Sequence, residues 1–318
     1  MAKPDCIELP ECDPIPILYE DRSILAIDKP RGWMLVPHTW QKTSWNLQAA
    51  ITSSIAGRDY WATSRGLKFL RFVHRLDADT SGILLFAKSL GAVEAFGDMF
   101  EGRRMEKTYL AVGVGEPRET EWLCQFKIGP DPRRFGRMQV DFKEGKNAET
   151  FFKVLDRRGQ LSLIEARPVT GRTHQIRIHL AESGLPIVSD DLYGRYEPGF
   201  ELGLRAIRLA YHDPFTRRRV DIRAPTEAFL KEYSFTGVKL SEEKAVPAPP
   251  SKPAESARVV KPFTPRPPGE PFRKGPKPPR NLPPREHGRP PRPHRQFKPR
   301  PKPNAEPKPD QPKPDQSA

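Results

Sequence analysis

The sequence predicts an α+β protein, with one domain built on a large, mainly antiparallel mixed sheet flanked by helices and a disordered tail after it. Apolar runs typical of strands outnumber amphipathic helical stretches, and the two do not alternate as in a doubly wound fold. Of the 38 prolines, 24 lie between Ser241 and Ala318. No run reaches the roughly 18 apolar residues of a membrane span, so we expect no membrane association.

The N-terminal half contains four predicted elements. After a flexible lead-in, 1–14, the apolar runs Ile15–Glu20 and Ile24–Pro30 flank a short polar turn, which is typical of a hairpin. Gly82–Lys88 is continuously apolar and indicates a buried strand, and Ser89–Gly102 has the apolar spacing of an amphipathic helix.

The later elements complete a domain that we place at 15–238. Helices are predicted over Thr173–Ser183, which Gly184 would end, and over Thr226–Tyr233. The predicted strands are Lys107–Val114, Thr150–Leu155, Leu161–Ala166, Ile207–Tyr211 and Arg219–Arg223.

The charge divides unevenly between the domain and the tail, 239–318. The chain has 54 Lys+Arg against 40 Asp+Glu, but 241–318 alone has 18 against 8, which leaves a net charge of only +4 on the first 240 residues. Few apolar residues lie in the tail, so it cannot bury enough surface to fold. It is either a solubilising segment or an arm that attracts RNA phosphates.

The N-terminus and the cysteines indicate a cytoplasmic protein. The first residues contain no apolar segment of a secretory signal. Cys6, Cys12 and Cys124 are too few and too scattered for a disulfide framework or a zinc site.

The first polar motif, His74–Gly82, directly precedes the buried strand predicted at Gly82–Lys88. Polar loop residues held by a rigid strand often carry function. Asp77 and Asp79 could act as an acid/base pair, bind a cation, or form a turn by bonding their own backbone. No third carboxylate lies in the segment, which argues against both the acid/base pair and the cation site.

The second motif, Arg167–His179, opens a predicted helix. Thr170 or Thr173 could cap it, and Arg172, His174 and Arg177 lie near its first turns, where a helix attracts phosphate. His174 and His179 are five positions apart and face different sides of a helix, which argues against a shared metal ion. We interpret His179 as a structural residue. In a third motif, Arg103–Leu110, Tyr109 could be a pocket residue or a half-buried sheet residue.

Taken in order, these segments resemble the RluA-type pseudouridine synthases. The resemblance runs from Ile17 to about Pro225 and is carried by the following segments: Ile27–Gly32, His74–Gly82, Lys107–Tyr109, Gly171–His179 and Gly184–Gly194. Many relatives begin with an S4 RNA-binding domain, which we expect to be absent here because only about 14 residues precede the first strand. The family usually has His where this chain has Arg205.

The resemblance implies an isomerase that converts a uridine in RNA to pseudouridine without a cofactor or a metal. It places the catalytic carboxylate at Asp77, which would attack C1′ or remove the C2′ proton. It places the ion-pair partner of that carboxylate at Arg177. Tyr109 would stack on the uracil and could assist C5 deprotonation, and the base would have to flip out of its stack.

The resemblance also implies one RNA contact, since Arg75 would fill the space that the flipped base leaves. Lys107 and Arg172 are our candidates for phosphate contact, His174 is a further candidate for RNA binding, and Asp79 only supports the loop. We expect a monomer acting on 23S rRNA or tRNA. The alternatives are a non-catalytic RNA-binding or ribosome-assembly factor of the same fold and a glycoside or nucleoside hydrolase, which would release free uracil.

Overall fold

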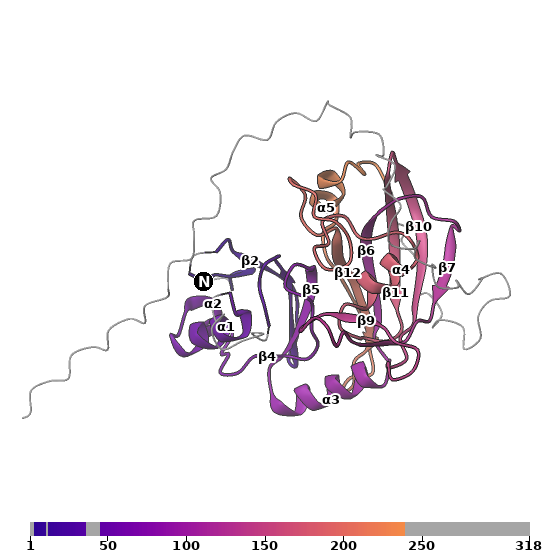
Figure 1. Cartoon of the computed structure of the whole chain (residues 1–318). Helices are drawn as coiled ribbons and strands as arrows, with labels where there is room; N and C mark the ends of the chain where they lie inside the picture. The colour runs from indigo at the N-terminus through magenta and orange to yellow at the C-terminus, as the bar shows by residue number, and fades with distance from the viewer. Residues whose placement is uncertain (1–2, 11, 36–44, 239–318) are drawn as a thin grey trace, which may run out of the picture. The chain divides into compact units, whose positions relative to one another are not determined.

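An eleven-stranded mixed sheet runs through the computed structural model, which describes residues 3–10, 12–35 and 45–238 (Figure 1). The tail predicted at 239–318 lies outside the described residues. The pairing is antiparallel except between β5 (Ser81–Ala87) and β12 (Leu204–His212), which are parallel. The predicted large, mainly antiparallel sheet is therefore confirmed.

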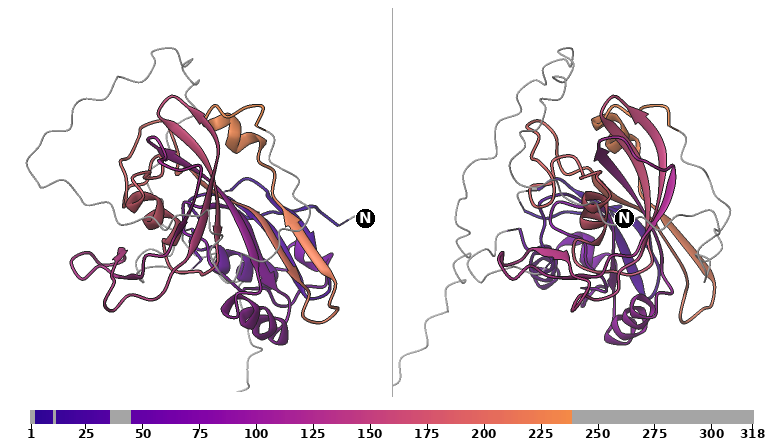
Figure 2. Two further views of the ribbon diagram at one scale, coloured as in Figure 1. Left: turned by 90° about the vertical axis from the view of Figure 1, so that its right-hand side faces the viewer. Right: turned by 45° about the vertical axis from the view of Figure 1, so that its right-hand side comes forward.

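The order of strands across the sheet joins distant parts of the chain. It runs β1 (Cys6–Ile7), β2 (Ile15–Glu20), β3 (Ile24–Lys29), β5, β12, β6 (Glu106–Val114), β11 (Leu161–Pro168), β10 (Thr150–Arg158) and β7 (Glu121–Cys124). Two further strands, β4 (Arg71–Phe72) and β13 (Arg219–Arg223), pair with β5 and β12. A separate hairpin consists of β8 (Ile128–Pro130) and β9 (Met138–Val140), and it stands off from the large sheet in the left view of Figure 2.

Helices cover both faces of the sheet. They are α1 (Leu47–Ala56), α2 (Tyr60–Thr63), α3 (Leu90–Glu101), α4 (Gln175–Glu182) and α5 (Glu227–Glu232). Ser89 caps the N-terminus of α3, because its side chain accepts a hydrogen bond from the Ala92 amide and so satisfies a free N–H of the first turn. Among the described residues, no helix is long and apolar enough to span a membrane.

The continuous apolar run of β5 is explained by burial on both faces. Leu84 and Phe86 belong to the apolar cluster that contains α1 and α2, whereas Ile83 and Leu85 belong to the cluster that contains α3. Because successive strand residues point to opposite faces, a strand covered on both sides shows no polar alternation.

Two apolar clusters meet on one face of the sheet. The cluster around β3, β5 and α1 includes Ala206, and the cluster around β10, β11 and α4 includes Leu204, two residues away on β12. Tyr109 of β6 lies opposite Ala206 and packs against both clusters. This junction is where the polar motifs converge.

Several predicted boundaries were wrong; β12, for example, begins at Leu204 instead of Ile207. The lead-in 1–14 is not flexible throughout, because Cys6–Ile7 pairs with β2 and Ile7 is fully buried. The helix predicted from Thr173 begins at Gln175 instead, because His174 has a left-handed backbone with φ of 56°.

Arg205, which departs from the family pattern, supports the parallel pairing. The buried side chain donates hydrogen bonds to Asp28 at 2.6 Å and to the carbonyl of Pro225 at 2.8 Å. It therefore ties β12 to β3 and to the chain after β13.

We expect Gly82→Ala to destabilise the fold by at least about 2 kcal/mol. Gly82 has φ of +110°, and an added Cβ would lie 2.1 Å from the carbonyl oxygen of Ala206 across the parallel pair. Urea unfolding would measure the change. The control is Gly97→Ala in α3, where a Cβ meets nothing within 4 Å and should stabilise the helix by up to about 1 kcal/mol.

We expect the stability to fall as the pH drops below about 6.5. Burial lowers the pKa of His179 to about 4, and the neutral ring lies 3.0 Å from Thr150 Oγ1 and 3.1 Å from the Phe126 carbonyl. In the unfolded chain this histidine binds a proton at its ordinary pKa of about 6.5. The free energy of unfolding therefore falls as the pH drops from that value toward the lower pKa of the folded state. His179→Asn should unfold more easily at pH 7 and lose about 1–3 kcal/mol less between pH 6.5 and 4. An unchanged pH slope in urea unfolding would contradict this.

Candidate active site

A buried lysine holds the loop that carries Asp77. The Nζ atom of Lys29 donates hydrogen bonds to the carbonyls of Pro30 at 2.9 Å, Ala78 at 2.7 Å and Thr80 at 3.0 Å. Burial lowers the pKa of Lys29 to about 7, although the charges of two nearby carboxylates oppose this. The loop is thereby fixed to the end of β3, and the Asp77 side chain remains 25% exposed.

A buried glutamine holds the turn that precedes α4. Gln175 Oε1 accepts hydrogen bonds from the Thr170 hydroxyl at 2.6 Å and the Arg172 amide at 2.9 Å. Its Nε2 donates to the Glu149 carbonyl and to Thr150 Oγ1, both at 2.9 Å. All four hydrogen-bonding positions of this amide are satisfied, so the turn is anchored to the start of β10.

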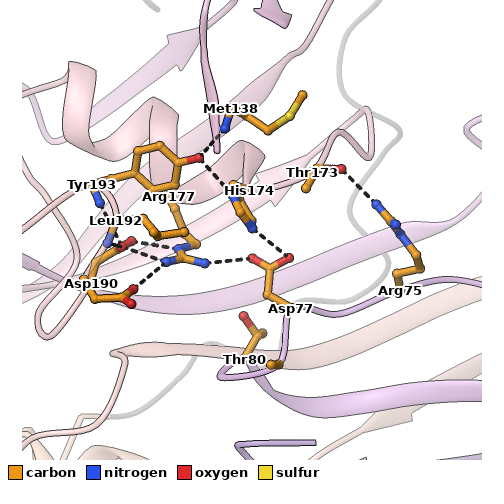
Figure 3. A network of polar contacts seen from close by, with 12 residues as sticks. Arg75, Asp77, Thr80, Met138, Thr173, His174, Arg177, Asp190, Leu192 and Tyr193 are labelled. Carbon is orange, nitrogen blue, oxygen red and sulfur yellow. Dashed lines mark hydrogen bonds and ion pairs between the residues drawn. The ribbon is translucent and has the colours of Figure 1, made fainter. Parts of the chain in front are cut away.

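Arg177 connects the two polar motifs. Its guanidinium lies 3.4 Å from Asp77 Oδ2 through Nη1, as Figure 3 shows, and the side chain is 4% exposed. Asp190 accepts from Arg177 Nε at 2.8 Å and from Nη2 at 2.7 Å, which is a bidentate pair. The exposed Asp191 lies 3.4 Å from Nη2.

The Asp190 carboxylate is fully buried and fully bonded. Besides Arg177, it accepts hydrogen bonds from the amides of Leu192 and Tyr193, both at 3.0 Å. Burial alone would lower the pKa of Arg177, but Asp190 and the charge of Asp77 raise it above its ordinary value. Arg177 is therefore a permanent cation whose position Asp190 determines.

His174 approaches the second carboxylate oxygen of Asp77, and Tyr193 holds its ring from behind. The Tyr193 hydroxyl accepts a hydrogen bond from the Met138 amide at 2.9 Å and lies 2.8 Å from His174 Nδ1. The other ring nitrogen, Nε2, is 3.9 Å from Asp77 Oδ1 (Figure 3). If the phenol donates to Nδ1, Nε2 carries the proton and faces the carboxylate.

Tyr109 is a neutral phenol at this site. Burial raises the pKa of Tyr109, and the charge of Asp77 raises it further. The ring therefore offers an apolar face beside the carboxylate, and a phenolate would be costly there.

The other predicted residues surround the pair of Asp77 and Arg177, either at the protein surface (the rim of the site) or below it. Arg75 is exposed and donates to Thr173 Oγ1 at 2.8 Å, which links the two motifs at the surface. Lys107 Nζ donates to the Thr170 carbonyl at 3.1 Å, and burial lowers its pKa to about 8. Arg172 donates to the Asn147 carbonyl at 3.1 Å.

The predicted side-chain cap of α4 is wrong, and the residue patterns do not identify two residues of the site. Neither Thr170 nor Thr173 caps α4, which has no side-chain cap, because their hydroxyls bond Gln175 and Arg75 instead. Asp190 and Tyr193 lie in a segment that carries the family resemblance, but nothing in their spacing indicated contact with Arg177 or His174. In the described part of the chain, no three His, Cys, Asp or Glu side chains are grouped to hold a metal ion.

Comparison with known proteins gives one consistent result. Residues 23–182 match the sequence model of the family described as RNA pseudouridylate synthase. Ribosomal large subunit pseudouridine synthase C of Vibrio cholerae is 33% identical over 236 residues, which cover 71% of this chain and 69% of that protein. An uncharacterized RNA pseudouridine synthase of Bacillus subtilis, YhcT, is 34% identical over 72% of this chain and 74% of its own length.

Solved structures give the same fold. Human RNA pseudouridylate synthase domain containing 1 superposes with a TM-score of 0.54 and 26% identity, over 66% of this chain and 83% of that one. The human domain containing 4 protein superposes with a TM-score of 0.55 and 20% identity, over 70% and 94%. The chain belongs to the RNA pseudouridine synthase family, whose members isomerise uridine in RNA.

Proposed function

We propose that this chain isomerises a uridine of large-subunit ribosomal RNA to pseudouridine, with Asp77 as the catalytic carboxylate. The observation that supports this most directly is the placement of a partly exposed Asp77 3.4 Å from Arg177, which Asp190 holds from behind. A carboxylate that is both accessible and paired with a fixed cation is suited to act in its ionised form.

The reaction needs an ionised carboxylate at a fixed position, and this arrangement provides one. The N1–C1′ bond breaks and a C5–C1′ bond forms, while the C5 proton is lost and N1 gains one, so the product is an isomer of the substrate. Asp77 either bonds C1′ or removes the C2′ proton, and both routes need an ionised carboxylate at a fixed position. Arg177, whose side chain is 4% exposed, provides that position.

Tyr109 and Arg75 are proposed to stabilise the flipped conformation of the target base. The raised pKa of Tyr109 favours stacking of its neutral ring on the uracil over a role as the C5 base. Arg75 would have to leave Thr173 to occupy the place of the flipped base, an exchange that its exposed position permits. Arg172 and His174 are proposed to contact the RNA at the edge of the site. Lys107 lies below them and is proposed to hold the Thr170 carbonyl in place.

The ribosomal substrate is proposed from the printed names of the relatives, with tRNA as the other candidate. The similar proteins of Vibrio cholerae and Escherichia coli are both named ribosomal large subunit pseudouridine synthase C. Monomeric state and cytoplasmic location stay predictions from the sequence.

Asp77→Asn should abolish pseudouridine formation, by about 10³-fold or more, because the amide can neither attack C1′ nor accept the C2′ proton. The assay is mass-spectrometric mapping of pseudouridine in separate ribosomal RNA and tRNA fractions from a strain lacking the gene. Wild-type protein should modify the ribosomal fraction and release no free uracil.

Equal product from Asp77→Asn and wild type would contradict the role of Asp77, and free uracil would indicate a hydrolase. Modification of the tRNA fraction alone would replace the ribosomal substrate. Matching urea midpoints would show that the variant is folded.

Asp190→Asn should lower the rate of product formation by about 10²-fold, because Arg177 loses the charge that orients it. Asp191→Asn is the matched control: this side chain is 68% exposed and lies 3.4 Å from the same guanidinium, so its loss should matter little. The measurement is single-turnover product formation, normalised to folded protein.

Arg177→Lys separates charge from geometry, because it keeps the cation but loses the bidentate contact. Its rate should resemble that of Asp190→Asn. Equal rates for Asp190→Asn and Asp191→Asn would show that the buried pair does not position Arg177.

A further inference from the structure

The loop between β8 and β9, Asp131–Arg137, holds a phenylalanine in solvent. The loop is closed by hydrogen bonds from the Asp131 amide to the Arg137 carbonyl at 2.9 Å and from the Arg137 amide to the Arg134 carbonyl at 3.1 Å. Asp131 Oδ1 accepts from the Arg133 amide at 2.9 Å. Phe135 lies at the tip of this bonded loop and is 94% exposed.

This exposure leaves the whole ring available to a partner. Phe135 is the most exposed large apolar side chain of the described residues, and it does not contribute to any apolar cluster among them. An aromatic ring in water gives up the free energy that burial would supply. Arg133 and Arg134, both exposed, precede it directly.

The same loop contributes to an open hollow of about 470 Å³, whose lining does not include Phe135. Its lining is polar and mainly cationic, with one carboxylate that lies 4.0 Å from Arg137. The lining residues are Asp131, Pro132, Arg133, Arg134, Arg137 and Gln139. Guanidinium groups around a hollow of this kind suit a phosphate, and an adjacent aromatic face suits a base.

The loop is connected to the candidate active site by direct contacts. The Arg137 guanidinium lies over the Tyr193 ring at 5.3 Å, and the Arg177 guanidinium lies over the same ring at 5.4 Å. The Met138 amide donates to the Tyr193 hydroxyl, which also contacts His174 (Figure 3). Tyr193 therefore joins the surroundings of Asp77 to the loop, and an RNA strand that leaves Asp77 across Tyr193 would reach the loop.

We propose that the loop Asp131–Arg137 binds an unpaired nucleotide of the RNA that flanks the target uridine. Phe135 stacks on its base, and Arg133 and Arg134 contact the neighbouring phosphates. The inference rests on the proposed function in one respect only, that the strand enters at Asp77. Stacking accepts any base, so the loop contributes affinity for single-stranded RNA and not for a particular sequence.

The test measures binding of the full chain to a fluorescein-labelled oligouridylate by fluorescence anisotropy over a range of salt concentrations. Phe135→Ala should weaken binding roughly 5- to 150-fold, the usual effect of removing one stacking ring. Phe135→Trp should restore it, and Phe135→Leu should not. The double variant Arg133→Gln/Arg134→Gln should reduce the salt slope by about 1.4.

The turn between β12 and β13 is a matched control, because it presents a similar set of side chains elsewhere. Phe215 is 54% exposed and its ring packs 6.3 Å from that of Phe96 in α3, with Arg217 and Arg218 following it. Phe215→Ala and Arg217→Gln/Arg218→Gln should leave the affinity within about twofold.

Equal losses in the two sets of variants would overturn the proposal and indicate general attraction of RNA to positive charge. Unchanged affinity of Phe135→Ala would also overturn it and would leave the ring as a contact for a protein partner. Equal weakening of binding to a double-stranded probe would exclude stacking on an unpaired base. Wild-type pseudouridine formation in the mapping assay is measured separately, so failure of the loop proposal is distinguishable from failure of the proposed function.

Discussion

The buried pair between Arg177 and Asp190 is the interaction on which the site depends. A guanidinium in this position would cost several kcal/mol without a partner, and Asp190 supplies two hydrogen bonds while two backbone amides complete the carboxylate. The pair leaves one nitrogen, Nη1, directed at Asp77. The orientation of the accessible carboxylate therefore follows from a contact that substrate does not touch.

Two further buried polar side chains make this geometry possible. Lys29 fixes the Asp77 loop through three carbonyls, and Gln175 fixes the turn before α4 through four hydrogen bonds. Each would be expensive if left unsatisfied, so alternative arrangements of the two loops are penalised. The sheet contributes by bringing these loops to one face, beside Tyr109, where two apolar clusters meet.

The two proposals place RNA binding and chemistry in neighbouring but separate parts of the molecule. The first 240 residues have a net charge of only +4, so the net charge of this part contributes little directional attraction. Local groups matter more: Arg75 and Arg172 lie at the rim, and the β8–β9 loop extends the same surface through Arg137 and Tyr193. Affinity can thus change in the loop without moving Asp77 or Arg177.

The sequence by itself determined the class of fold, the main strands and the residues of the two polar motifs, because apolar periodicity and short motifs are local properties. It predicted that Asp77 and Arg177 form a pair only through the family resemblance. The partnership of Arg177 with Asp190, the support from Gln175 and the contact of the β8–β9 hairpin with Tyr193 were decided by the tertiary structure. These contacts join residues on separate elements that no sequence spacing relates, and they exist only because the sheet places those elements side by side.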